Sequence, residues 1–172
     1  MNSRMQLVVG TALVVLAALS RLIPHPMNFA PITAIALFGG MYFDKRFAPV
    51  LPFLALLISD YFIGFYDGIM WVYGSFIVSV GTGMWLKSRK SVPVIAAATV
   101  ANSILFFVIS NFGVWYSELL YPRTFAGLVE CYTLALPFFR NTLAGDLFYV
   151  AVMFGAYEIL MKYLPKAEAT KA

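Results

Sequence analysis

Long stretches without a charged residue constrain this sequence more than any other feature. These stretches cover residues 5–20, 27–43, 47–59, 68–86 and 91–117, and residues 141–157 contain Asp146 as their only charge. A transmembrane helix requires about 20 mostly apolar residues. The pattern therefore predicts an all-α polytopic membrane protein with one domain, residues 1–172. Its six transmembrane helices are expected at about residues 5–23, 30–43, 47–66, 69–86, 92–114 and 139–164.

The composition excludes several other classes of protein. Hydrophobic residues make up 62% of the 172 residues and charged residues 12%, whereas soluble domains carry about 25% charged residues. A domain of this size could not bury so much apolar surface in water, which excludes a soluble globule. One Cys and one His exclude an internal disulfide and a zinc site built from Cys and His alone. We expect no cofactor and no bound metal.

Lysine and arginine are distributed unevenly between the two predicted membrane faces. Nine of them fall on the side of the N-terminus: Arg4, Lys45, Arg46, Lys87, Arg89, Lys90, Lys162, Lys166 and Lys171. Three fall on the opposite side: Arg21, Arg123 and Arg140. Because short cytoplasmic loops are enriched in Lys and Arg, both termini are predicted to be cytoplasmic.

The first apolar run has a second interpretation. Arg4, the run itself and the sequence Ala18-Leu19-Ser20 would also fit a cleaved signal peptide. Its removal would leave five helices and make the charge distribution less regular.

Polar and aromatic residues gather in three connections on the outer side, at residues 21–31, 60–73 and 111–141. A polar cluster with aromatic neighbours at one end of a bundle fits a small-molecule pocket that opens outward. An aromatic belt with loops that simply face water is the alternative. The candidate substrate-binding residues are Asn28, Asp60, Trp71, Asn111, Trp115, Arg140, Asn141 and Asp146.

Besides Glu158, which pairs with Lys162 on the cytoplasmic side, two carboxylates fall inside the predicted helices. Asp60 shares a helical face with Gly64 and Asp67, and Asp146 shares one with Thr142, Tyr149 and Met153 on the last helix; Ser103, Phe107 and Ser110 form a similar stripe on the fifth. A carboxylate in the hydrocarbon should face the bundle interior and have a partner. Arg140 is the predicted partner of Asp60 or Asp146. These carboxylates either handle cargo or protons, or form an ion pair that fastens the third helix to the sixth.

Motifs for catalysis and for nucleotide or nucleic-acid binding are absent from the sequence. No nucleophile–base pair, no phosphate-binding loop and no long basic run occurs. The chain is therefore predicted not to be an enzyme and not to bind nucleic acid. His25 lies between two prolines, and Cys131 lies before the last helix. Either residue could have a functional role or a purely structural one. Residues 118–136 could form either a short surface helix or a re-entrant loop.

Four segments carry a resemblance to known proteins. They are residues 21–40 (RLIPHPMNFAPITAIALFGG), 57–64 (LISDYFIG), 111–115 (NFGVW) and 137–149 (PFFRNTLAGDLFY). With them the chain resembles a family of small, uncharacterised bacterial membrane proteins. That family in turn resembles the substrate-binding (S) components of energy-coupling factor (ECF) vitamin transporters, through its size, six helices and both ends inside.

The resemblance implies a bacterial inner-membrane protein that binds a vitamin-sized molecule on its outer side. It also implies docking to an ECF coupling subunit driven by two ATPases. The docking pattern of two alanines four residues apart is missing from the first helix, which has Ala12, Ala17 and Ala18. A cobalamin cargo is not implied, since Cys131 lies outside the third-helix loop.

Four functional hypotheses follow. The first is the substrate-binding membrane subunit of a micronutrient importer, in which Asp60 and Asp146 suit N–H donors or positive charge and Arg140 suits a carboxylate. The second is a stand-alone proton-coupled small-molecule transporter. A membrane enzyme acting on a lipid and a purely structural protein rank below these two.

Overall fold

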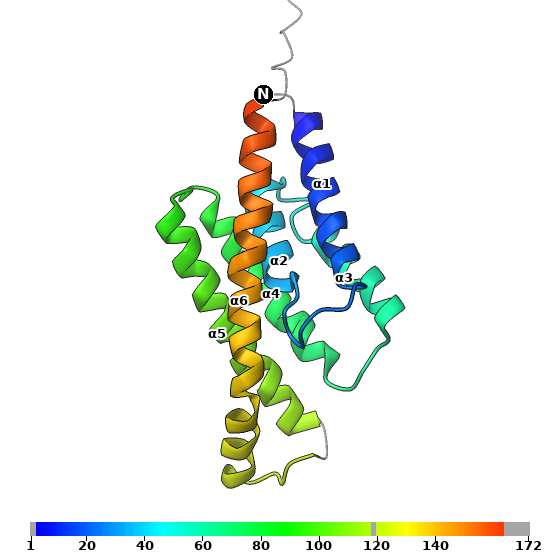
Figure 1. Cartoon of the computed structure of the whole chain (residues 1–172), viewed down its shortest axis with the longest axis vertical. Coiled ribbons are helices and arrows are strands. Elements are labelled where there is room, and N and C mark those ends of the chain that lie inside the picture. Colours follow the sequence, from blue (N-terminus) through cyan, green and yellow to red (C-terminus); the bar gives the residue numbers. More distant parts are fainter. Residues whose placement is uncertain (1–2, 118–119, 164–172) are drawn as a thin grey trace, which may run out of the picture.

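The structure is a computed structural model that describes residues 3–117 and 120–163. The described residues form six α-helices and no strand, which confirms the predicted all-α fold. The helices are α1 Ser3–Ser20, α2 Ile32–Tyr42, α3 Val50–Ile63, α4 Ile69–Leu86, α5 Val92–Ser117 and α6 Phe125–Tyr163. Figure 1 shows an elongated bundle in which α5 and α6 continue beyond the other helices, at the end away from the N-terminus.

Three of these helices, α4, α5 and α6, are long and apolar enough to cross a membrane. The other three contribute shorter apolar segments, Arg4–Ser20 in α1, Ile32–Tyr42 in α2 and Val50–Ile63 in α3. Since about 20 residues match the hydrocarbon core, the structure supports a membrane protein with three helices of spanning length. The sequence predicted six membrane-spanning helices, and three of the six described helices have the length and composition of such a span.

The last helix starts much earlier than predicted. α6 runs for 39 residues, from Phe125 to Tyr163, instead of over residues 139–164. Residues 125–136 are therefore part of α6 and not a separate surface helix or a re-entrant loop. Pro137 lies inside the helix, where it removes one backbone donor and crowds the carbonyl four residues earlier. In apolar surroundings, ending the helix there would leave several backbone groups without partners.

The short helix α2 forms the centre of the bundle. Nine of its 11 residues are buried, as expected for a helix that is apolar on all sides. It packs against each of the other helices, α4 and α6 among them. The Phe38 ring makes edge contacts with the rings of Phe43, Phe154 and Tyr157 at 5.3 to 6.1 Å. A helix enclosed in this way does not have to match the thickness of the bilayer.

Glycines allow α2 and α4 to approach closely. A Cβ atom on Gly40 would lie 2.2 Å from the carbonyl oxygen of Val80, and one on Gly83 would lie 2.3 Å from that of Leu37. Small residues at such contacts are typical of helices that pack in membranes. The contact fixes the second half of α2 against the second half of α4.

The end of α3 corrects one sequence prediction. Gly64 has φ 105°, and its N–H donates to the carbonyl of Asp60 at 2.8 Å, as in a glycine that terminates a helix. Asp60 lies inside α3, whereas Asp67 is exposed in the following turn. The expected helical face of Asp60, Gly64 and Asp67 therefore does not exist, because the helix ends before its last two members.

The contact between α2 and α4 can be tested with two substitutions on one helix. We expect Gly83→Ala to lower stability by about 1–3 kcal/mol, the usual cost of overpacking, because its Cβ would meet backbone atoms of α2. Gly81→Ala is the control, since a Cβ there meets nothing within 4 Å. The measurement is the unfolding midpoint of the purified protein in detergent. Equal midpoints for the two variants would contradict the packing.

Candidate functional site

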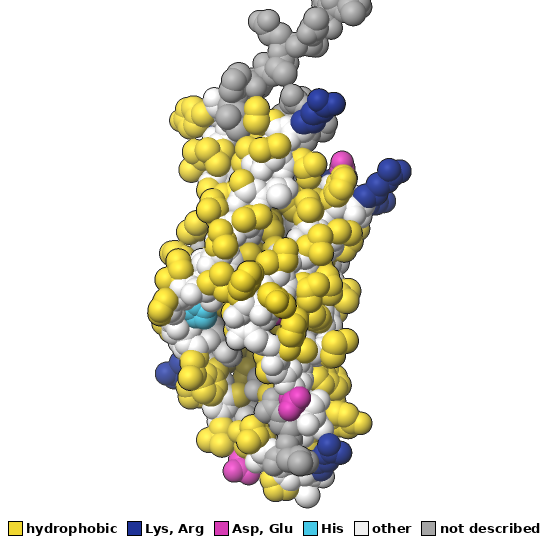
Figure 2. Space-filling view, turned by 90° about the vertical axis from the view of Figure 1, so that its right-hand side faces the viewer, with side chains coloured by type: hydrophobic (Ala, Val, Ile, Leu, Met, Phe, Trp, Pro, Cys, Tyr) yellow, Lys and Arg dark blue, Asp and Glu magenta, His cyan; other side chains and the backbone are white. Residues whose placement is uncertain are grey.

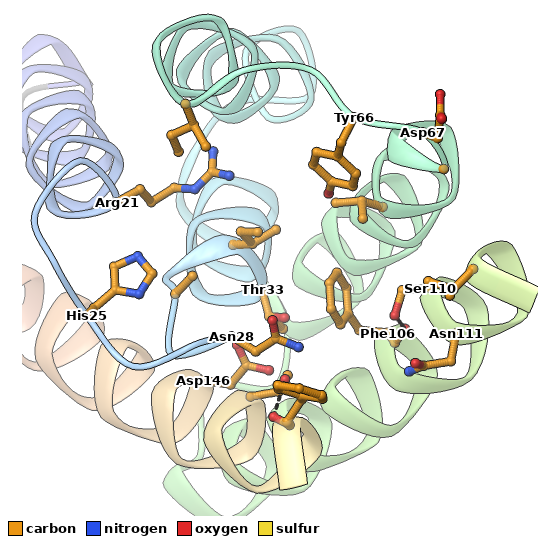
Figure 3. A pocket seen from close by; sticks show the side chains of 18 residues that line it. Arg21, His25, Asn28, Thr33, Tyr66, Asp67, Phe106, Ser110, Asn111 and Asp146 are labelled. Atoms are coloured by element: carbon orange, nitrogen blue, oxygen red, sulfur yellow. Dashed lines mark hydrogen bonds between the residues drawn. The ribbon is translucent and has the colours of Figure 1, made fainter. Parts of the chain in front are cut away.

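A cavity of about 460 Å³ lies between the loop after α1, the start of α2, the α3–α4 turn, α5 and α6. Figure 3 shows side chains from all of these segments facing one another across it. Its mouth is exposed at His25, Asn28 and Asp67, and its floor is buried at Thr33 and Asp146. The polar residues that line it are Arg21, His25, Asn28, Thr33, Tyr66, Asp67, Ser110, Asn111, Thr142 and Asp146.

An ion pair forms one wall of the site. Arg21 Nη2 lies 2.5 Å from Asp60 Oδ1, and the two side chains are 8% and 3% exposed. Tyr73 donates its hydroxyl to the other oxygen of Asp60 at 3.0 Å. Arg21 also donates to the hydroxyl of Ser59. Asp60 is thus neutralised and hydrogen-bonded on both oxygens, and the pair joins the end of α1 to α3 and α4.

This pair corrects the prediction that Arg140 is the partner of Asp60 or Asp146. Arg140 is exposed and does not line the cavity. It lies six residues before Asp146, which places it about 120° away around a helix of 3.6 residues per turn. The expected ion pair between the third and sixth helices is therefore replaced by one between Arg21 and α3.

Asp146 lies on the floor of the cavity, is 1% exposed and comes from the middle of α6. Ser103 of α5 donates its hydroxyl to Asp146 Oδ2 at 2.6 Å, and Thr33 of α2 is a second hydrogen-bonding partner. No ion pair joins Asp146 to a basic side chain among the described residues. The carboxyl group thus has polar neighbours but no counter-charge.

The stripes predicted around this carboxyl group are largely confirmed. Thr142, Asp146 and Met153 of α6 are buried, and so is Ser103 of α5. These positions face the bundle interior because they recur at helical spacing. Periodicity therefore located Ser103 correctly, although it did not show that this residue donates to Asp146.

The eight candidate binding residues divide into two groups. Asn28, Asn111 and Asp146 line the cavity, and Asp60 lies behind Arg21 in the wall. Trp71, Trp115, Arg140 and Asn141 do not line it.

The two tryptophans have structural contacts instead. Trp71 packs against Gly113, and its indole N–H donates to the hydroxyl of Ser117 at 3.0 Å. The indole N–H of Trp115 donates to the carbonyl of Pro122 at 3.0 Å. Trp71 therefore holds the start of α4 against the end of α5, and Trp115 holds the end of α5 against the segment that precedes α6.

Asn141 holds the loop of residues 21–31 in place. Its amide donates to the carbonyl of Met27 at 2.9 Å. Phe29 in the same loop packs against the rings of Phe148 and Tyr149 at 5.7 Å each. Gly145 lets this loop lie directly on α6, because a Cβ there would be 3.1 Å from the Cα of Phe29. The loop thereby brings Asn28 next to Asp146 (Figure 3).

The sequence did not identify several lining residues as part of the site. Thr33, Phe106 and Phe138 line the cavity, but each lies in an apolar run with no pattern that separates it from core residues. Thr33 reaches the site because α2 begins beside Asp146, which is a tertiary feature. His25 lies at the mouth, with its Nδ1 2.9 Å from the carbonyl oxygen of Pro26.

Metal binding finds no support in the described residues, where no group of three His, Cys, Asp or Glu side chains could hold an ion. Cys131 is buried, and its thiol donates to the carbonyl of Asn111 at 3.4 Å. This contact gives Cys131 a structural position beside the site.

Residues 1–168 match one protein family, described as a family of unknown function (DUF6580). No curated protein matches the chain, and no solved structure matches it. The resemblance to ECF S components therefore stays a prediction from the sequence motifs.

The ion pair that forms the cavity wall gives a stability prediction. We expect Arg21→Met to cost about 3–5 kcal/mol, because it leaves the buried Asp60 without its counter-charge. Removing both charges in Arg21→Met with Asp60→Leu should restore most of the loss. Arg140→Met, at an exposed position, should change stability by less than about 0.5 kcal/mol.

The measurement is reversible unfolding in mixed micelles, followed by tryptophan fluorescence. A double variant that is no more stable than Arg21→Met alone would contradict the role of the ion pair.

Proposed function

We propose that this chain, which belongs to that family of unknown function, is the substrate-binding membrane subunit of an importer for a vitamin-like micronutrient. The observation that carries the proposal is the polar cavity at one end of an apolar helix bundle, with a buried carboxyl group on its floor. Binding subunits need a site of this kind and no catalytic group.

The size and lining of the cavity support recognition of a small organic molecule. Its volume of about 460 Å³ falls within the range of about 300–1,000 Å³ for ligand pockets. Hydroxyl and amide groups of Ser110 and Asn111 line the cavity together with apolar surface from Val72 and Phe106. Mixed walls of this kind bind an apolar body and orient it through a few hydrogen bonds.

Six membrane passages with both termini in the cytoplasm of a bacterial inner membrane are part of the proposal. Figure 2 supports a membrane location, since most of that face is apolar and its charged side chains lie towards the upper and lower ends. The excess of basic residues on the side of the N-terminus supports the orientation. In this arrangement the cavity faces outward, as an S-component-like bundle requires.

The ECF coupling subunit and its ATPases rest on the sequence resemblance alone. A stand-alone proton-coupled transporter is the second candidate, and Asp146 favours it, because a buried carboxyl group without a counter-charge is suited to carry a proton. Substrate uptake by the isolated protein in vesicles, abolished by an uncoupler, would support this candidate over the first. A membrane enzyme acting on a lipid ranks lower.

Native mass spectrometry of the gently purified protein tests the binding function. We expect a co-purified molecule of vitamin size on the unmodified protein. Ser110→Trp should abolish it by filling the cavity, whereas Ile104→Trp should retain it, since Ile104 is exposed on the same helix. A protein without any bound molecule, or one whose ligand survives Ser110→Trp, would contradict the proposed site. Co-purified subunits would indicate the importer rather than the lone transporter.

Reporter fusions test the proposed topology. Green fluorescent protein fused after Ala172 should fluoresce, since it folds in the cytoplasm. Alkaline phosphatase inserted after Pro122 should be active, since this enzyme requires the periplasm. A dark fusion at Ala172, or an inactive phosphatase at Pro122, would contradict six passages with both ends inside.

A further inference from the structure

We infer that the cavity binds an organic cation, a molecule with a protonated amine or another positively charged nitrogen group that pairs with Asp146. This inference rests on the proposed binding function and names its substrate class. It follows from which charges around the cavity are already matched and which are not.

Asp60 does not provide the binding charge. Both of its oxygens are occupied, by Arg21 at 2.5 Å and by the hydroxyl of Tyr73 at 3.0 Å. A ligand that used Asp60 would have to displace Arg21 from a buried ion pair, which is unfavourable because it leaves a buried charge unpaired. The same pairing neutralises Arg21, so this residue does not offer its full charge to an anionic ligand.

Asp146 has acceptor capacity left over. A carboxylate offers about four lone-pair sites, and the structure gives this one two hydrogen-bonding partners, Ser103 and Thr33. Thr142, one turn away, uses its hydroxyl to donate to the carbonyl of Phe138 at 3.1 Å. The remaining acceptor sites can therefore take a donor from the cavity, and a cationic donor also supplies the missing counter-charge.

The other unpaired charge in the described lining, that of Asp67, has the same sign as the carboxylate of Asp146. Asp67 lies at the mouth, and Figure 3 shows it on the opposite side of the cavity from Asp146. Because Arg21 is balanced by Asp60, the two remaining carboxylates give the described lining a negative balance. Clefts lined by one sign of charge concentrate ligands of the opposite sign.

The ligand is an organic cation rather than a metal ion. A bare cation would need several carboxylate or carbonyl oxygens in one place, and the described residues hold no cluster of three metal-ligating side chains. Apolar side chains, Val72 and Phe106 among them, form part of the cavity walls. These walls fit an apolar or aromatic body that carries the charge.

Three matched probes of one shape test this inference: 4-fluorophenethylammonium, 2-(4-fluorophenyl)ethanol and 3-(4-fluorophenyl)propionate. Their binding to the purified protein in detergent is followed by ¹⁹F NMR at neutral pH. We expect the ammonium probe to bind at least about tenfold more tightly than the other two, because charge-assisted hydrogen bonds are about twice as strong as neutral ones. Asp146→Asn should reduce this preference to less than about twofold.

Asp67→Asn is the matched control, since it removes the exposed carboxylate at the mouth and should retain most of the preference. Any partition of the probes into micelles is common to all variants and cancels in the comparison. The charge preference of the unmodified protein does not depend on whether Asp146→Asn folds.

Equal binding of the three probes, or tighter binding of the carboxylate, would overturn the cation inference and leave the binding function intact. A preference that survives Asp146→Asn would also overturn it, since Asp146 would then not be the anchor. No binding of any probe, to 10 mM, would count against the cavity as a binding site and so against the proposed function itself.

Discussion

The high cost of an unmatched charge in an apolar environment is the constraint on which the rest of this structure depends. Arg21 and Asp60 meet it together, and their pair connects the end of α1 to α3 and, through Tyr73, to α4. Once this pair is fixed, the loop that follows α1 has to start beside α3. The loop then runs along the cavity to the start of α2, and its residues His25, Asn28 and Ala30 form part of the cavity lining.

Asp146 meets the same constraint differently. Hydroxyl groups from α5 and α2 surround it, but no described basic side chain pairs with it. Packing alone would favour an apolar residue at this central position of α6, since a buried carboxyl group without a counter-charge destabilises a bundle. Its position on the floor of a cavity is what links the stability of the fold to a proposed ligand.

The helices could be predicted from the sequence because hydrophobic runs report them directly. The predicted residues 69–86 agree with α4, where Gly68 and the basic residues after Leu86 limit the apolar run. The start of α6 was missed because Pro137 and Glu130 interrupt the pattern on which such predictions depend. Arg140 was assigned to the interior by its charge alone, and its angular position on α6 places it outside.

The sequence by itself determined an all-helical, strongly apolar chain with Asp60 and Asp146 inside its helices, because hydropathy and charge are properties of single residues. Only the tertiary structure decided that Arg21 neutralises Asp60 and that Thr33 and Ser103 reach Asp146. It also decided that Trp71 packs on α5 and that Trp115 donates to the Pro122 carbonyl, instead of lining the cavity. These outcomes depend on the rotation of each helix and on the path of the loop at residues 21–31. Both are set by contacts between segments that are far apart in the chain, such as the glycine contact of α2 with α4.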